Sequence, residues 1–137
     1  MQRSSANYQE LNPISFLIRA FSVYPEKTAI IYNEKVFTWK DTFLRCKGLA
    51  LALKQVGLSK GDVVGFVATN TPELYEAHFG VPMAGMVLNA INCRLDAKTI
   101  AYIIDHSKIK LLVSDKEFSA TISKAIRLSK IKPILVD

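Results

Sequence analysis

Residues 61–115 read GDVVGFVATNTPELYEAHFGVPMAGMVLNAINCRLDAKTIAYIIDHSKIKLLVSD and contain three apolar runs separated by two stretches with helix signals. These runs span residues 63–68, 86–91 and 110–114. The first is continuously apolar, which is typical of a strand covered on both faces of a parallel sheet. Each helical stretch begins at a residue suited to cap a helix, Thr71 before Pro72 and then Asp96. Strands alternating with helices of this length predict parallel βαβ units in an open α/β sheet.

The N-terminal part of the chain has a different pattern. Asn12 followed by Pro13 predicts a helix start, because Asn can cap a helix and Pro is tolerated at its first position. Residues 28–32 and 36–37 are β-branched and apolar and flank a turn, which predicts a small hairpin. We expect residues 1–11 to form a flexible lead.

The helix after this hairpin has clear signals at both ends. Thr38 and Asp41 have the spacing of a capping box, and Gly57 is suited to end the helix. Its apolar side chains recur at helical spacing and predict one buried face. These residues are Trp39, Phe43, Cys46, Ala50 and Leu53.

Towards the C-terminus the pattern of helix and strand continues. Residues 116–129 predict a further helix and residues 133–136 a last short strand. Pro82 interrupts the helical pattern after Pro72 and should kink or end that helix. We therefore expect residues 12–137 to form one α/β subdomain with a largely parallel sheet.

Composition excludes several classes of protein. The 137 residues are 50% hydrophobic and carry a formal net charge of +6, which predicts a folded domain with scattered basic residues. No block of five or six like charges is present, so a nucleic-acid-binding arm is not indicated, and no apolar run reaches the roughly 20 residues of a transmembrane helix. The two cysteines, Cys46 and Cys93, are far apart and predict reduced thiols in a cytoplasmic protein.

The sequence contains no complete loop for binding a nucleotide phosphate. The nearest match to a Walker loop is GVPMAG at residues 80–85, but Met86 and Val87 stand where Lys and Ser or Thr are required. The turn at residues 70–72 could present backbone amides to an anion. A simple helix cap at Thr71 explains the same residues, and we favour it.

Other reactive side chains lack partners at the spacing that catalysis or metal binding requires. His78 is expected to pack among aromatic neighbours, and His106 to complement a helix C-terminus. Asp115 and Glu117 could act as an acid and base, but an acidic helix entrance explains them equally well. The sequence therefore predicts no catalytic residue and no metal site.

Several short motifs follow one another in an order that resembles the N-terminal subdomain of the AMP-forming acyl-CoA synthetases. The resemblance covers the chain from about Pro13 to Asp137. The motifs are KVFTW at residues 35–39, GDVV at 61–64, NTPE at 70–73, an apolar helix ending in AG at 84–85, and NCRL at 92–95 followed by residues 100–107. The resemblance is greatest to the branch that activates fatty or aromatic carboxylic acids, and it implies a role in fatty acid and lipid metabolism.

This resemblance implies an enzyme that uses ATP, Mg²⁺ and coenzyme A. Such enzymes join a carboxylate to AMP, release pyrophosphate and transfer the acyl group to the thiol of coenzyme A. The phosphate loop and the magnesium, ribose and lysine motifs of the family have no match in residues 1–137, so no catalytic role can be assigned to this chain. One ligand contact is implied: Arg94 could meet a phosphate of coenzyme A. An arginine on an exposed loop is the simpler interpretation.

Two hypotheses for the function follow. In the first, the chain is an N-terminal fragment of such a synthetase, inactive alone, and its partner is the remainder of the enzyme or a second copy of itself. It then leaves a sheet edge and apolar surface bare. In the second, it is a free-standing α/β module that binds a protein or a nucleotide-like ligand and is monodisperse on its own.

Overall fold

The structure is a computed structural model that describes residue 8 and residues 12–137. The predicted flexible lead at residues 1–11 lies outside the described residues, apart from the exposed Tyr8. The chain divides into two compact units, Met1–Leu44 and Arg45–Asp137, which are described separately below. The predicted assignment of residues 12–137 to one subdomain stays a prediction.

The first unit contains helix α1 (Pro13–Val23) and a hairpin of strands β1 (Thr28–Tyr32) and β2 (Lys35–Thr38). Both were predicted. The side chain of Asn12 accepts a hydrogen bond from the backbone N–H of Ser15 at 2.9 Å, which caps α1. Strands β1 and β2 are antiparallel, and Asn33 in their turn has a φ of 52°, a conformation that Asn tolerates better than most residues.

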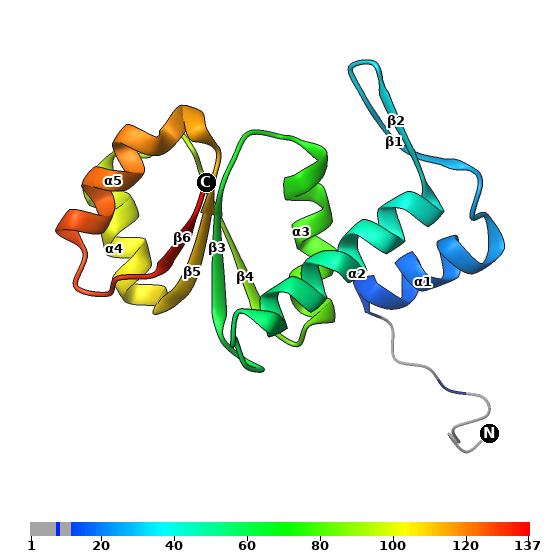
Figure 1. Cartoon of the computed structure of the whole chain (residues 1–137), viewed down its shortest axis with the longest axis horizontal. Helices are drawn as coiled ribbons and strands as arrows, with labels where there is room; N and C mark the ends of the chain where they lie inside the picture. The colour runs from blue at the N-terminus through cyan, green and yellow to red at the C-terminus, as the bar shows by residue number, and fades with distance from the viewer. Residues whose placement is uncertain (1–7, 9–11) are drawn as a thin grey trace. The chain divides into compact units, whose positions relative to one another are not determined.

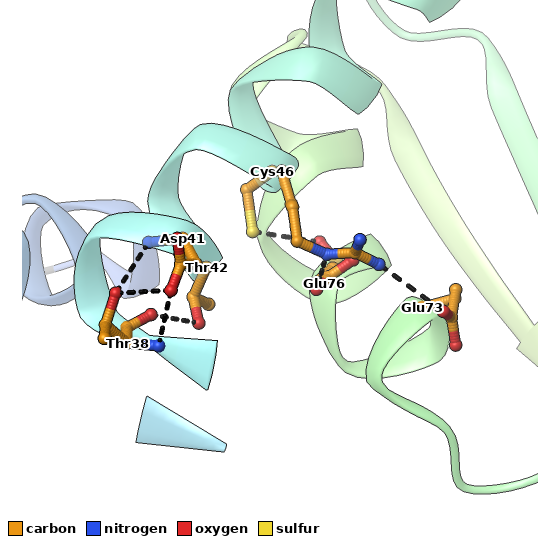
Figure 2. Close-up of polar contacts among 7 residues, drawn as sticks. Thr38, Asp41, Thr42, Cys46, Glu73 and Glu76 are labelled. Carbon is orange, nitrogen blue, oxygen red and sulfur yellow. Dashed lines mark hydrogen bonds and ion pairs between the residues drawn. The ribbon is translucent and has the colours of Figure 1, made fainter. Parts of the chain in front are cut away.

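Helix α2 (Trp39–Gln55) begins with the predicted capping box. The Asp41 carboxylate accepts hydrogen bonds from the backbone N–H of Thr38 at 2.9 Å and from its hydroxyl at 2.6 Å. The Thr38 hydroxyl oxygen in turn accepts one from the Asp41 N–H at 3.1 Å, as Figure 2 shows. Beyond the last helical turn Gly57 has a φ of 88°, which L residues with side chains rarely adopt, so this glycine is required at the helix end.

The second unit is built on a sheet of four parallel strands in the order β4-β3-β5-β6 (Figure 1). The strands span Val63–Val67 (β3), Val87–Ile91 (β4), Ile109–Ser114 (β5) and Ile134–Val136 (β6). The open parallel α/β sheet expected from the sequence is thus confirmed. The strand expected over residues 86–91 is β4, which begins at Val87 and lies at one edge of the sheet, where Val87 and Ala90 are exposed.

Helices cover both faces of this sheet. In Figure 1, α4 (Ala97–Ser107) and α5 (Ser119–Leu128) lie on one face, and α3 (Pro72–Met83) with the second half of α2 lies on the other. The core is correspondingly divided into two clusters. Val64 and Phe66 of β3 point into the cluster with α2 and α3, whereas Val67 belongs to the cluster with α4 and α5.

Two of the next three local features differ from the sequence-based expectations. Thr71 occupies the cap position of α3, but its side chain makes no capping hydrogen bond. Pro82 lies inside α3, which ends one residue later at Met83, as expected of a proline that ends the helix. The single helix expected over residues 116–129 is divided into a short 3-10 helix (Lys116–Phe118) and α5, because the Asp115 carboxylate caps the shorter turn by accepting from the Glu117 N–H at 3.3 Å.

Side chains bond to the backbone of the segment that leads from α5 into β6, residues 129–133. The Asp105 carboxylate of α4 accepts hydrogen bonds from the N–H groups of Lys130 at 2.8 Å and Ile131 at 2.9 Å. These bonds lower the pKa of Asp105. The Lys132 amine donates to the carbonyls of Ile126 and Ser129 at the end of α5. The turn from α5 into β6 is therefore fixed on both sides.

Candidate functional site

The carboxyl edge of the parallel sheet brings three candidate loops together. Val67, at the end of β3, is level with Ile91 of β4 and Ser114 of β5. The Asp115 N–H also donates to the Val67 carbonyl at 3.0 Å. The segments that follow these strands, residues 68–71, 92–96 and 115–118, therefore leave the sheet at one edge, where open α/β proteins bind their ligands.

Arg94 lies on the loop between β4 and α4 at this edge. Its backbone N–H donates to the side-chain oxygen of Asn92 at 2.9 Å, which holds the turn, and the residue is exposed. The neighbouring Cys93 is half-buried against the cluster under α4 and α5. The loop backbone is thus anchored, while the Arg94 side chain lies at the surface. A contact with a phosphate of coenzyme A stays a prediction.

The turn at residues 70–72 enters α3 at the same edge. The Thr71 N–H is bonded to the Thr69 carbonyl at 2.8 Å, and the Thr71 carbonyl accepts from the Tyr75 N–H at 3.1 Å. Thr71 occupies the cap position of α3, but its hydroxyl makes no capping hydrogen bond. The side-chain cap that we favoured from the sequence is therefore not observed. An anion held at this turn stays a prediction.

The glycines of GVPMAG have structural roles that account for their presence. A Cβ on Gly80 would lie 2.9 Å from the Cys46 carbonyl oxygen, so Gly80 lets α3 approach α2 closely. Gly85 has a φ of 83° in the turn that leads from α3 into β4, and its carbonyl accepts from the Gly61 N–H at 2.9 Å. This turn lies before a strand, at the amino edge of the sheet, so it is not a phosphate loop.

The histidines and acidic residues do not form a reactive cluster. His78 is exposed, contrary to the packed position expected, and its Nδ1 lies 2.8 Å from the Leu74 carbonyl oxygen. His106 stacks on Tyr102 with ring centroids 5.4 Å apart. Within residue 8 and residues 12–137, no three metal-ligating side chains gather into a possible metal site.

A polar cluster that the sequence analysis missed joins α2 to α3 within the second unit. Arg45 Nε donates to Glu76 Oε1 at 2.5 Å, and Arg45 Nη2 lies 3.4 Å from Glu73 Oε1. Glu76 is almost fully buried at 5% exposure, whereas the Arg45 side chain is 40% exposed. The hydrogen bond to Glu76 raises the pKa of Arg45. Figure 2 shows Glu76 between Cys46 and Glu73 in this cluster.

The Cys46 thiol completes the cluster but is not reactive. Its Sγ lies 3.6 Å from the Glu76 carbonyl oxygen, and the residue is fully buried. Burial, followed by the charge of Glu76, raises the pKa of this thiol to about 12, so it stays protonated at neutral pH. One signal for the cluster was present in the sequence: Glu76 is spaced four residues from both Pro72 and Gly80, which are on the buried face of α3.

A surface hollow lies beside α4, lined by Lys98, Tyr102, Asp105, His106, Leu128 and neighbouring residues. Tyr102 and Leu128 are 64% and 52% exposed. Small-molecule sites usually enclose most of the ligand, so this open hollow lacks the shape of a substrate pocket.

No helix within the described part of the chain is long and apolar enough to cross a membrane.

Comparison with known proteins gives a consistent result. The profile of a family described as AMP-binding enzyme matches residues 17–136. The chain is 50% identical over 123 residues to a peroxisomal butyrate–CoA ligase of Arabidopsis thaliana, covering 90% of this chain and 22% of that protein. It is also 50% identical over 123 residues to a peroxisomal benzoate–CoA ligase of the same plant, with 90% and 21% covered.

The fold is also found in solved structures. The crystal structure of an anthranilate–CoA ligase in complex with anthranoyl-AMP aligns with a TM-score of 0.84 and 24% identity, over 98% of this chain and 27% of that one. At this identity the likeness concerns the fold alone. The chain spans about a fifth of the length of the two Arabidopsis ligases.

Proposed function

The chain belongs to the family of AMP-binding enzymes, and from this premise we propose that it is the N-terminal scaffold of an acid–CoA ligase. The observation that supports the proposal most strongly is its 50% identity to two acid–CoA ligases over 90% of its length. The sheet, the two helical layers and the loops at the carboxyl edge then form the frame on which the remaining parts of the enzyme assemble.

The reaction of such a ligase has two steps. A carboxylate oxygen attacks the α-phosphorus of ATP, which forms an acyl-adenylate and releases pyrophosphate; the sulfur of coenzyme A then attacks the acyl carbon and releases AMP. Both steps need groups that stabilise negative charge on phosphate and acyl oxygens. Residues 1–137 contain no complete nucleotide loop, and Arg45 is bonded to the buried Glu76 between α2 and α3. We therefore expect residues 1–137 alone to be inactive.

Pyrophosphate release tests this proposal. The purified chain is incubated with ATP, Mg²⁺, coenzyme A and a panel of short-chain, fatty and aromatic acids. A second sample contains a chimera in which residues 17–136 replace the matching part of the Arabidopsis butyrate–CoA ligase. Activity of the chimera but not of the chain alone is expected; turnover by the chain alone, or a well-folded chimera without activity, contradicts the proposal.

The acid that is activated is part of the same proposal. The names of the relatives favour short-chain and aromatic carboxylic acids, such as butyrate and benzoate, over the long-chain fatty acids that the sequence analysis also allowed. The same panel tests this, with rates compared at equal acid concentration. A preference for long-chain acids by the chimera would favour a role in fatty acid metabolism.

For Arg94 we retain the contact with a phosphate of coenzyme A as a proposal. Its support is the position of the residue, exposed on an anchored loop at the carboxyl edge of the sheet. In the chimera, Arg94→Gln should raise the KM for coenzyme A by about tenfold, the effect of losing a charged hydrogen bond, and leave the KM for ATP unchanged. Lys124→Gln, an exposed residue on α5, is the control; equal effects of both changes would contradict the proposal.

The compartment is a further proposal, and here the two lines of support differ. The composition and cysteines favour the cytoplasm, whereas both Arabidopsis relatives are named peroxisomal. Imaging of the protein with an N-terminal fluorescent tag, beside a peroxisomal marker, distinguishes the two locations.

A further inference from the structure

The outer sides of α4 and α5 are largely polar. The buried residues of both helices recur at helical spacing: Ala97, Ile100, Ala101 and Ile104 on α4, and Ile122 and Ala125 on α5. The opposite sides are exposed and carry mostly charged and polar residues, the arrangement of helices at the surface of a protein. This pattern belongs to the two helices themselves, so we expect the same sides to face solvent in a longer protein as well.

Two large apolar side chains interrupt this polar surface, and they meet in one hollow. Tyr102 on α4 is 64% exposed, and Leu128 at the end of α5 is 52% exposed. Both line the hollow beside α4 described above, where the His106 ring stacks on Tyr102. Exposed apolar side chains that gather in one place within a polar rim are typical of a protein-binding surface.

The rim of this hollow is basic. Lys98 and Lys130 line the hollow and are exposed. Residues 97–132, which include α4 and α5, contain eight Lys and Arg and three Asp and Glu, and so carry +5 of the chain's net charge of +6. The ion pairs among the described residues involve Lys40 and Arg45, and none involves these eight cations. The positive charge of the chain is thus concentrated in this layer.

The acidic side chain that lines the hollow is bonded to the chain itself. The Asp105 carboxylate accepts hydrogen bonds from the backbone N–H groups of Lys130 at 2.8 Å and Ile131 at 2.9 Å. These bonds join α4 to the segment after α5, so the two sides of the hollow are held together. A binding surface that is already ordered loses less conformational entropy on binding than one that must first fold.

We propose that this hollow docks an acidic peptide segment of a partner protein. An aromatic or large aliphatic side chain of the segment packs against Tyr102 and Leu128, and carboxylates beside it lie near Lys98 and Lys130. Buried apolar anchors supply most of the affinity of such contacts. The positive charge of the layer favours an acidic segment over a neutral or basic one and speeds its association.

The same observations disfavour two other occupants. A second copy of the chain would bring two positive surfaces together, because a two-fold interface uses the same patch on both copies. A nucleic acid would match the charge, but the aliphatic Leu128 offers no ring on which a base can stack. The inference goes beyond the proposed function and does not depend on it.

Fluorescence anisotropy with the full chain tests the proposal. The probe is a fluorescein-labelled peptide of Asp and Glu residues with Leu and Phe at its centre. We expect saturable binding, at least tenfold weaker binding when Ser replaces both apolar residues, and no binding when Lys replaces the acidic residues. Hydrogen exchange at residues 98–106 should slow at least threefold with the peptide bound, and exchange at residues 47–55 of α2 should not change.

Matched substitutions on the two faces of the sheet locate the contact. Leu128→Ala and Lys98→Glu should each weaken binding of the peptide about tenfold. Leu51→Ala and Lys54→Glu make the same changes on α2, which covers the other face of the sheet in Figure 1, and should each weaken it less than twofold. Leu51 is 53% exposed, close to the exposure of Leu128. Thermal unfolding checks the folding of all four variants, and the hydrogen-exchange comparison needs none of them.

Each other outcome overturns the inference. The absence of saturable binding does so, as do equal effects of the substitutions on the two faces. Tighter binding of a single-stranded oligouridine RNA would make the occupant a nucleic acid. Concentration-dependent dimers of the chain alone, with protection of residues 98–106, would make it a second copy. The peptide assay contains neither ATP nor coenzyme A, so its result is independent of the pyrophosphate assay of the proposed function.

Discussion

The two compact units differ in the sequence separation of the contacts that hold them. In the first unit, several polar side chains bond to neighbours three or four residues away, as in the pairs Asn12 with Ser15 and Thr38 with Asp41, and the longer contacts include Glu26 with Lys40 and Phe21 with Phe43. In the second unit, Arg45 and Glu76 are 31 residues apart, and the two core clusters join strands to helices across the whole unit. Contacts of the first kind can be read from sequence spacing, and contacts of the second kind only from the fold.

The largest expected effect comes from removing a long-range contact in the core. Leu112 on β5 is fully buried, so Leu112→Ala should reduce the free energy of unfolding by about 3 kcal/mol through lost burial and the cavity left behind. In the first unit, Ile31 on the hairpin is 72% exposed, and Ile31→Ala should cost less than about 1 kcal/mol.

Chemical denaturation followed by circular dichroism measures both changes. Fluorescence of Trp39, the only tryptophan, reports on the first unit separately. Equal effects of the two changes would contradict the difference in burial between Leu112 and Ile31.

Two glycine substitutions sharpen the contrast at the packing of α2 against α3. Gly80→Ala should destabilise the chain by about 2 kcal/mol, because the new Cβ meets the Cys46 carbonyl at 2.9 Å and forces two helices apart. Gly48→Ala, on α2 with no atom within 4 Å of the new Cβ, should stabilise it by up to about 1 kcal/mol. Opposite shifts in the denaturation midpoint are expected. Shifts of the same sign would show that helix propensity, and not close packing, determines both sites.

The pH dependence of stability tests the buried cluster of the second unit. The pKa of the Cys46 thiol is raised from its ordinary value of 9.0 to about 12, chiefly by burial. Above pH 9 the unfolded chain loses this proton while the folded chain keeps it. The free energy of unfolding should therefore fall by about 1.4 kcal/mol per pH unit between pH 9 and 12 from this group alone.

Cys46→Ala provides the comparison for this prediction. Other groups titrate in the same pH range, so the quantity measured is the difference in slope between the unsubstituted chain and the variant. The slope should be less steep in the variant. Identical slopes would mean that the thiol is not shielded from water as the structure shows.

Helix caps give the smallest expected effects, and they differ between helices. Asp96 accepts hydrogen bonds from the N–H groups of Lys98 and Thr99, so Asp96→Ala should cost about 1 kcal/mol. Thr71→Ala should cost no more than about 0.3 kcal/mol, because the Thr71 side chain makes no capping bond and only propensity changes. Thermal unfolding measures both. A larger loss for Thr71→Ala would show that its hydroxyl caps α3 in solution.

Much of the fold could be predicted from the sequence because its signals are local. The caps at Asn12, Thr38 and Asp96 and the glycine at residue 57 are confirmed, as are the hairpin and the parallel strands. The cap at Thr71 was wrong because residue type alone does not fix the rotamer of a hydroxyl. The exposed position of Val87 was missed because an apolar strand has the same composition at an edge as in the interior.

The candidate site was less predictable for a physical reason. The partnership of Arg45 with Glu76 depends on how α2 and α3 are aligned, and no sequence spacing encodes that alignment. Asp105 likewise bonds to backbone groups 25 and 26 residues away. By contrast, the loop of Arg94 could be placed at the carboxyl edge as soon as the parallel sheet was predicted, since consecutive strands then end at one edge.

The unequal burial of the two cysteines has a practical consequence for spectroscopy. Thiol-reactive dyes attack the thiolate, and Cys46 is both sealed in the core and protonated at neutral pH. A dye therefore reaches Cys93 first, on the half-exposed turn next to Arg94. The native chain can thus carry a single fluorophore at the carboxyl edge of its sheet without any engineering.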